Sequence, residues 1–99
     1  MSLAIAILNY NGADLLKRFL PSVLAHSGTA SIYVIDNGST DSSKAVLAAD
    51  FPSVSCIALD QNFGYAEGYN RGIAQMDEDL ICLLNSDVQV TPQWTEPMV

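Results

Sequence analysis

Four polar clusters contain the side chains that could take part in chemistry, and each cluster follows an apolar run. They are Asn9-Tyr10-Asn11-Gly12, Asp36-Asn37-Gly38-Ser39, Asp60-Gln61-Asn62 and Asn85-Ser86-Asp87. Their amides, hydroxyls and carboxylates can hydrogen-bond a nucleotide base or a ribose. A carboxylate can also bind a hard divalent cation, which then bridges phosphates. The clusters therefore indicate a nucleotide site built from carboxylates and amides.

Two of the carboxylates are the main candidates for such a site. Asp36 follows the second apolar run, where it can accept hydrogen bonds from a base imide or a ribose hydroxyl. The same spacing is typical of a cap at the start of a helix. Asp87 directly follows the fourth apolar run, where a carboxylate can bind Mg²⁺ or Mn²⁺ and where solvated turn residues also occur. Spacing alone leaves both pairs of interpretations open.

The apolar runs predict the strands that would position these clusters. Each run is four to six residues long and apolar at successive positions, as in parallel strands that are covered on both faces. The runs are Leu3–Leu8, Ile32–Ile35, Val54–Leu59 and Leu80–Leu84.

Helices are predicted between the strands. The first has apolar residues at helical spacing on either side of Pro21, which we expect to kink or split it. Ser39-Thr40-Asp41 offers caps for a second helix, which carries Ala45–Ala48 and ends near Pro52. A third helix begins near Tyr65. Its expected buried residues are Ala66, Tyr69, Ile73 and Ala74.

This alternation of strands and helices predicts an α/β fold, with an open, mostly parallel sheet and helices on both faces. The chain has 99 residues, which suits one small domain with one core. Ligands of such sheets bind beyond the carboxyl ends of the strands. All four polar clusters should therefore lie on one edge of the sheet.

Composition limits the partners and the compartment. Eleven acidic residues against four basic ones give a formal charge of −7, which argues against nucleic acid as a main partner. A metal ion or backbone N–H groups can still bind the phosphates of a nucleotide. The run Leu3–Leu8 is too short for a signal peptide or a membrane span, so we expect a cytoplasmic protein. Cys56 and Cys82 lie in apolar runs and are expected to be reduced core thiols.

Three familiar phosphate-binding patterns do not fit the sequence. A dinucleotide-binding domain would need GxGxxG after the first strand, where only Gly12 is present, although Asp36 stands where that fold has its ribose-binding acid. The GxxxxGK[ST] phosphate loop is absent. A phosphoacceptor domain would place its aspartate at Asp60, but it would also need acidic residues where Asn9 and Asn11 stand.

In their order and spacing, the motifs closely resemble family 2 glycosyltransferases of the GT-A fold, over essentially the whole chain. The style is closest to the rhamnosyltransferase-like branch, in which N-x-D replaces the usual D-x-D. The resemblance implies that residues 1–99 are the Rossmann-like, nucleotide-sugar-binding part of such a domain, truncated at the C-terminus. The segments that carry it are Asn9-Tyr10-Asn11, Val34 to Asp41, Asn62 to Ile73, and Leu83 to Val88.

The resemblance also implies roles for individual residues. The segment Leu8 to Asn11 would hold the base and ribose, Asp36 would hydrogen-bond a uracil or thymine ring, and Asp87 would ligate Mg²⁺ or Mn²⁺. The full set of implied donor-binding residues is Leu8, Asn9, Tyr10, Asn11, Asp36, Asn62, Gly64, Asn70, Asn85 and Ser86.

Within that set, Asn62 and Gly64 would lie in a loop that closes over the donor, and Asn70 would shape the same pocket. Asn85 and Ser86 would approach the ribose and the diphosphate. Asn85 stands where many relatives have the first aspartate of D-x-D, so a weaker metal affinity is expected.

The chain differs from the family pattern at Asn85 and also in its third motif, Asn62 to Ile73. Many relatives have Arg directly before its asparagine, where this chain has Tyr69. Arg71 follows Asn70 instead, so we assign it no phosphate role.

Family members invert at the anomeric carbon, where an acceptor hydroxyl displaces the nucleoside diphosphate. The resemblance implies UDP- or dTDP-sugar donors and a saccharide or lipid-linked saccharide acceptor, in cell-envelope polysaccharide synthesis at the inner face of the membrane. The catalytic base comes from a later segment in the family, so none of these residues is expected to be catalytic and the 99 residues alone should be inactive. The open flank of the truncated sheet should favour self-association.

Two other classes of function stay open on the sequence alone. A non-catalytic relative that binds a nucleotide or polysaccharide as a sensor would keep Asp36 without needing a base. A structural interaction domain would have no ligand at the polar clusters. Simpler roles also remain for Gly64 and Gly68 in chain reversal and close helix packing. The same holds for Tyr65 and Tyr69 as a packed helical pair, for His26 at a helix C-terminus, and for Trp94 in packing or beside the acceptor cleft.

Overall fold

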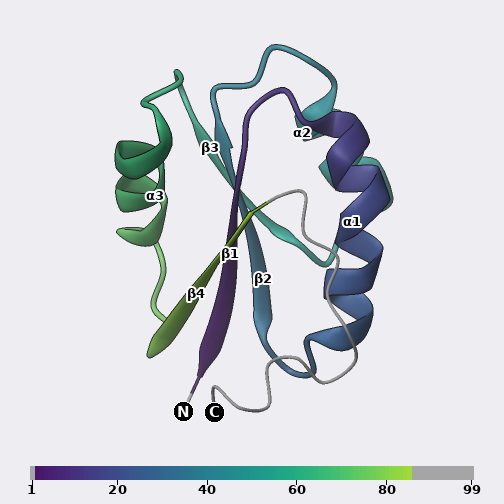
Figure 1. The fold of residues 1–99 in the computed structure, drawn as a ribbon, viewed down its shortest axis with the longest axis vertical. Coiled ribbons are helices and arrows are strands. Elements are labelled where there is room, and N and C mark those ends of the chain that lie inside the picture. The colour runs from purple at the N-terminus through teal and green to yellow at the C-terminus, as the bar shows by residue number, and fades with distance from the viewer. Residues whose placement is uncertain (1, 86–99) are drawn as a thin grey trace.

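The computed structural model describes residues 2–85 and folds them into one parallel sheet covered by three helices (Figure 1). The strand order is β3-β2-β1-β4, and every neighbouring pair is parallel. The predicted α/β fold with helices on both faces is confirmed. In chain order the elements are β1 (Leu3–Asn9), α1 (Ala13–His26), β2 (Ser31–Asn37), α2 (Ser43–Asp50), β3 (Ser55–Leu59), α3 (Tyr65–Ile73) and β4 (Leu80–Asn85).

The helices divide between the two faces of the sheet, with α1 and α2 on one face and α3 on the other (Figure 1). Alternation along β1 sends Ile5 and Ile7 into the core beneath α1 and α2, and Ala6 into the core beneath α3. The larger core therefore lies under the two helices, which contribute Leu16, Leu20, Val23, Val46 and Leu47.

The outer position of β3 corrects one prediction about the thiols. Ile57 and Leu59 face the core under α3, so Cys56 points to the opposite face, where it is exposed. Cys82 is half-buried and packs against the larger core, as expected. Cys56 is therefore not a core thiol.

Helix α1 runs through Pro21 without splitting. The ring removes one backbone donor, but Leu16, Leu20 and Val23 stay buried on the sheet side of one continuous helix. Packing of this apolar stripe outweighs the loss of one hydrogen bond, so of the two predicted effects, a kink or a split, the split does not occur. His26 lies in the last turn, where we placed it.

Helix α3 begins at Tyr65 as predicted and buries Tyr69, while Ile73 is half-buried against the core. Ala66 and Ala74 are exposed, which contradicts their expected burial. Glycines instead occupy the sheet-facing side of this helix, at Gly68 and Gly72. A short helix can approach the sheet more closely through glycine than through alanine.

Candidate functional site

The carboxyl ends of the strands bring three of the four polar clusters together at one edge of the sheet. Hydrogen bonds join Asn9 to Asp36, Asn11 to Thr40, and Asn37 to Asn62. The fourth cluster begins at the same edge, because Asn85 ends β4 in register with Leu8. Ser86 and Asp87, together with Trp94, lie outside the described residues.

Asp36 lies at the centre of this edge and has no exposed surface (0%). Its Oδ1 accepts hydrogen bonds from Asn9 Nδ2 at 3.0 Å and from Ser39 Oγ at 2.7 Å, and its Oδ2 accepts from the Ser39 amide at 3.1 Å. These bonds offset the cost of burying a carboxylate and tie β1 to the turn after β2. Asp36 does not cap α2, which begins only at Ser43.

Asn9 is as deeply buried as its partner, at 1% exposure. Its Nδ2 also donates to Ser39 Oγ at 3.3 Å, and these bonds turn its Oδ1 the other way. That oxygen has no hydrogen-bond partner among the described residues, and a Cβ on Gly12 would lie 2.5 Å from it. Glycine is therefore required at position 12, because any side chain there would collide with the Asn9 amide.

Asn11 connects the first loop, between β1 and α1, to the second loop, between β2 and α2. It has a positive φ of 50°, and its Oδ1 accepts hydrogen bonds from the amides of Thr40 at 2.7 Å and Asp41 at 3.1 Å. The backbone N–H of Asn11 donates to Ser39 Oγ at 2.9 Å. Asparagine tolerates this left-handed conformation better than most residues, so it can occupy the turn and make these contacts.

Asp41 serves the starts of two helices, a role that the sequence interpretation assigned only loosely. One carboxylate oxygen accepts from the Ser43 amide at 2.9 Å and from the Ser43 hydroxyl, at the start of α2. The other oxygen accepts from the Ala13 amide at 3.2 Å, at the start of α1. The pKa of Asp41 is lowered chiefly by the hydrogen bond from the Ser43 hydroxyl. The hydrogen bonds from the backbone amides of Ser43 and Ala13 lower it further.

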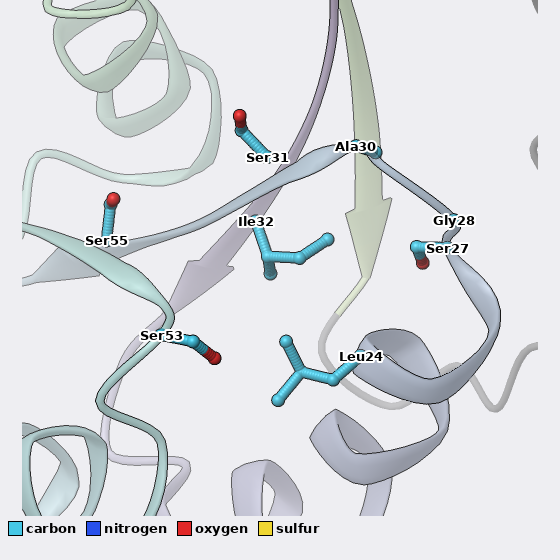
Figure 2. A pocket seen from close by; sticks show the side chains of 8 residues that line it. All are labelled: Leu24, Ser27, Gly28, Ala30, Ser31, Ile32, Ser53 and Ser55. Carbon is cyan, nitrogen blue, oxygen red and sulfur yellow. The ribbon is translucent and has the colours of Figure 1, made fainter.

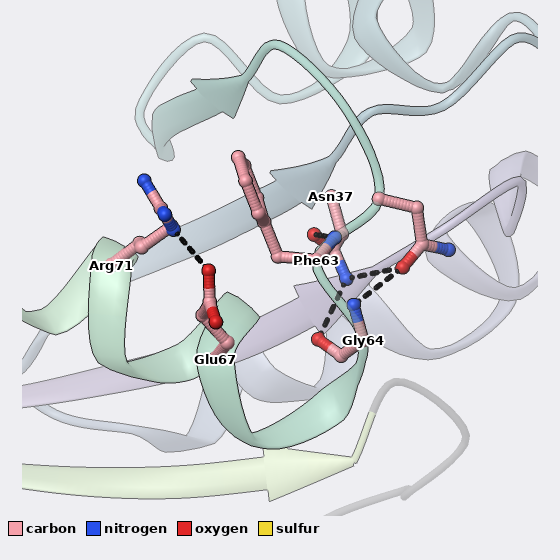
Figure 3. Close-up of polar contacts among 6 residues, drawn as sticks. Asn37, Phe63, Gly64, Glu67 and Arg71 are labelled. Carbon is pink, nitrogen blue, oxygen red and sulfur yellow. Dashed lines mark hydrogen bonds and ion pairs between the residues drawn. The ribbon is translucent and has the colours of Figure 1, made fainter.

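Asn37 fixes the loop between β3 and α3, called the third loop below, against the end of β2 (Figure 3). Its Nδ2 donates to Asn62 Oδ1 at 3.1 Å and to the Gly64 carbonyl at 3.0 Å, while its Oδ1 accepts from the Phe63 amide at 3.0 Å. The side chain is buried, so an amide with both donors and an acceptor is needed there. The sequence interpretation listed no individual role for Asn37, although an asparagine in the polar cluster after a buried apolar run was a usable signal.

Close backbone contact also fixes the second and third loops relative to each other. Gly38 has a φ of 75°, and a Cβ there would lie 2.4 Å from the Gln61 carbonyl carbon. Gly64 has a φ of 80° and directly precedes α3. Both positions therefore need glycine for conformation, and Gly38 needs it for space as well.

Arg71 packs over this loop and does not stand alone. Its Nε donates to Glu67 Oε2 at 2.7 Å, and its guanidinium carbon lies 3.9 Å from the centre of the Phe63 ring (Figure 3). The ion pair is half-exposed and so contributes little, but the stacked guanidinium covers Phe63. These contacts give Arg71 a packing role in the described chain.

Tyr69 joins the helix α3 to the ends of two strands. Its hydroxyl accepts a hydrogen bond from the Leu8 amide at 3.3 Å and donates to the Leu84 carbonyl at 3.0 Å. Its ring meets that of Tyr65 edge to face, with centroids 5.1 Å apart, which confirms the expected packed pair. Burial raises the pKa of the Tyr69 hydroxyl, and no sequence signal pointed to its contacts with β1 and β4.

The remaining candidate residues differ in their access to a ligand. Tyr10, Asn11 and Asn62 are exposed at this edge, Asn70 is exposed on α3, and Leu8 is half-buried. Among the residues that the structure describes, no group of three or more His, Cys, Asp or Glu side chains could hold a metal ion. The expected metal ligand, Asp87, lies beyond them.

A cavity of about 250 Å³ opens at the opposite edge, near the amino ends of β2 and β3 and the end of α1 (Figure 2). Its wall carries no ionisable side chain. The lining residues are Leu24, Ser27, Gly28, Ala30, Ser31, Ile32, Ser53 and Ser55. The chemistry-bearing side chains therefore do not gather at this cavity.

None of the helices in residues 2–85 is long and apolar enough to cross a membrane.

Comparison with known proteins agrees with this architecture. The family model described as "Glycosyl transferase family 2" matches residues 4–99. The succinoglycan biosynthesis protein ExoO of Rhizobium meliloti is 38% identical over 91% of this chain and 26% of its own length. An N-acetylglucosaminyl-diphospho-decaprenol L-rhamnosyltransferase of Mycobacterium tuberculosis is 32% identical over 91% of this chain and 33% of its own.

The fold also matches a solved structure, the mannosyltransferase PcManGT of Pyrobaculum calidifontis in complex with GDP-Man and Mn²⁺. The TM-score is 0.82 at 17% identity, over 95% of this chain and 30% of that one. The chain thus spans about a quarter to a third of the length of the proteins it matches.

Proposed function

The chain belongs to glycosyltransferase family 2, and from this membership we propose that it binds the nucleotide-sugar donor of an inverting glycosyltransferase. The observation that carries the proposal is the family match over residues 4–99, which includes all four polar clusters. The names of the two relatives support polysaccharide biosynthesis as the setting. We propose UDP or dTDP as the nucleotide, a saccharide or lipid-linked saccharide as the acceptor, and the cytoplasmic side of the membrane as the place.

The polar edge supports a division of labour among the proposed donor-binding residues. The side chains of Tyr10, Asn11, Asn62 and Asn70 are exposed and so are accessible to a nucleotide. Asn9 and Asp36 are buried and hydrogen-bonded to each other, so we propose that they chiefly hold the loops in place. Because Asp36 has no exposed surface, direct contact with a base would require the residues around it to move.

The proposed reaction is a single displacement. The oxygen of an acceptor hydroxyl forms a bond to the anomeric carbon as the bond from that carbon to the diphosphate oxygen breaks. The nucleoside diphosphate leaves with the bonding electrons, and a carboxylate base takes the acceptor proton. From family membership we propose that this base lies outside the 99 residues. Within the described edge, Asp36 and Asp41 already accept hydrogen bonds from other residues.

A divalent cation belongs to the same proposal. Asp87 is the residue that we propose to hold Mg²⁺ or Mn²⁺, which would neutralise charge on the departing diphosphate. The mannosyltransferase of the same fold was solved in complex with GDP-Man and Mn²⁺, which supports this choice.

Calorimetric titration of the chain with UDP, dTDP and GDP, with and without Mn²⁺, tests the proposal. We expect UDP or dTDP to bind more tightly than GDP, and Mn²⁺ to strengthen binding. Asp87→Ala should remove the strengthening alone. Asn70→Ala should weaken binding about tenfold, the effect of one lost hydrogen bond. Gln75→Ala, another exposed amide just beyond α3, is the matched control and should bind as the wild type does.

Absence of nucleotide binding, both here and in a longer protein that contains this chain, would overturn the proposal. Binding by the longer protein without sugar transfer would favour a non-catalytic sensor. Sugar transfer by the 99 residues alone would contradict the proposed position of the base.

A further inference from the structure

We propose that Tyr69 is a positioning residue of the donor site, whose hydroxyl fixes the carboxyl ends of β1 and β4 relative to each other. The inference rests on the proposed function, because Leu8 and Asn85 at these ends are two of the proposed donor-binding residues. It assigns the Tyr69 side chain a role that is separate from contact with the ligand.

The contacts of the hydroxyl are specific to this pair of strands. Tyr69 Oη accepts from the Leu8 amide at 3.3 Å and donates to the Leu84 carbonyl at 3.0 Å. Leu8 is the register partner of Asn85, the residue after Leu84. One oxygen atom therefore links both strands to α3 at the last paired position before their loops begin.

This link lies at the point where the order of strands reverses. The chain places β2 and β3 on one side of β1 and then returns to place β4 on the other. Loops that follow the two neighbouring strands leave in different directions at such a point, and ligands of open α/β sheets bind in the crevice between them. The separation of β1 and β4 there sets the width of that crevice.

The glycines of α3 explain how a helical side chain reaches the strands. A Cβ on Gly68 would lie 3.1 Å from Leu8 Cδ1, and one on Gly72 would lie 2.3 Å from Ile35 Cδ1. The helix therefore lies unusually close to β1 and β2, and Figure 1 shows it covering this face of the sheet. At this distance the phenol of Tyr69, at 3% exposure, can place its oxygen beside backbone atoms of both strands.

The hydroxyl and the ring have separable functions. The ring fills the core under α3 with Ile35, Ile57 and Leu59, and phenylalanine would preserve that packing. Only the hydroxyl links Leu8 to Leu84. Binding residues must be held within about 0.5 Å of their working positions, so loss of the link should weaken ligand binding.

The test compares Tyr69→Phe with Tyr33→Phe. Tyr33 is half-buried on β2, and its hydroxyl donates to Glu78 at 3.0 Å near the amino end of the sheet. Each variant loses one tyrosine hydroxyl and keeps the aromatic ring. Tyr33→Phe therefore controls for a general loss of stability in Tyr69→Phe. Urea unfolding of each variant establishes that it is folded.

Amide hydrogen exchange measures the link without any ligand. In Tyr69→Phe we expect exchange at Leu8 to rise about tenfold, with the β1–β2 amides near Val34 unchanged. In the wild type, the Tyr69 hydroxyl proton should give a nuclear Overhauser effect to the Leu8 amide, a measurement that needs no variant. Unchanged exchange in Tyr69→Phe, or no such effect in the wild type, would overturn the link.

Nucleotide titration then measures the positioning role. We expect Tyr69→Phe to weaken UDP or dTDP binding about tenfold, with Tyr33→Phe unchanged. Equal affinities in the two variants would refute positioning and leave the proposed function intact. If the wild type and a longer protein that contains this chain bind no nucleotide, the proposed function fails and positioning fails with it, while hydrogen exchange still decides the link.

Discussion

At the scale of single residues, the buried carboxylate of Asp36 organises the polar edge. Its oxygens accept three hydrogen bonds from Asn9 and Ser39, and it has no exposed surface. In the described residues Asp36 is therefore an internal hydrogen-bond acceptor, and its contact with a base stays a prediction. Its neighbours Tyr10 and Asn11 are exposed.

Replacing Asp36 by asparagine should destabilise the fold. An amide has one acceptor oxygen, so its NH₂ group would face either the Ser39 amide or Asn9 Nδ2, and both are donors. We expect Asp36→Asn to cost about 1–3 kcal/mol in urea unfolding. The control, Asp50→Asn on the exposed end of α2, should cost much less. Equal losses would show that the network around Asp36 contributes no net stability.

Asp41 predicts a component of acid sensitivity. Its pKa is lowered by the hydrogen bonds from Ser43 and Ala13, so its contribution is present above the pKa of the unfolded chain, about 4. The contribution is lost as the pH falls through the lower, folded value. Asp41→Asn should therefore lose less stability than the wild type on acidification from about pH 5 to pH 2, as measured by urea unfolding. Parallel pH curves would contradict this.

At the scale of elements, the position of α3 depends on what its sheet-facing side lacks. Gly68 and Gly72 allow the helix to lie close to Leu8 and Ile35. The sequence interpretation expected Ala66 and Ala74 to be buried, because helical spacing counts apolar residues, and it considered close helix packing only for Gly68. Close approach matters more than apolar content here, since it brings Tyr69 to the strands.

Gly72→Ala tests the close approach. The new Cβ would lie 2.3 Å from Ile35 Cδ1, so helix or side chain must move, at a cost of about 1–3 kcal/mol. Ile35→Ala removes the obstacle but leaves a cavity. Urea unfolding measures the loss of stability in each single variant and in the double variant. The loss in the double variant should be smaller than the sum of the two single losses. Additive losses would show that this contact does not limit the approach.

At the scale of the whole molecule, β4 is an outer strand of the described sheet. It presents Leu83, which is 48% exposed, along with Leu80. The chain spans only a quarter to a third of its relatives' length, and outer strands with exposed leucines favour association with further chain. Self-association through this flank stays a prediction.

Leu83→Lys tests that prediction. A charged side chain on an outer strand discourages pairing, so light scattering at high concentration should give a lower mass for Leu83→Lys than for the wild type. Thr29→Lys, at an exposed position between α1 and β2, adds the same charge away from β4 and serves as the control. A monomeric wild type would refute self-association, whatever the variant does.

The sequence by itself determined the order of elements, the parallel sheet and the edge at which polar residues gather, because apolar runs and helical spacing reflect burial directly. It also indicated the packed pair of Tyr65 and Tyr69 through their spacing of one helical turn. These features depend on local periodicity, and periodicity is visible in a single chain.

Only the tertiary structure decided how the polar residues divide their work. Asp36 turned inward, Asn37 holds the third loop, and the Tyr69 hydroxyl links β1 to β4. The exposure of Cys56 and the continuity of α1 through Pro21 were also decided there. Each depends on partners distant in sequence, and no pattern along the chain specifies which partner a side chain meets when loops from separate strands converge.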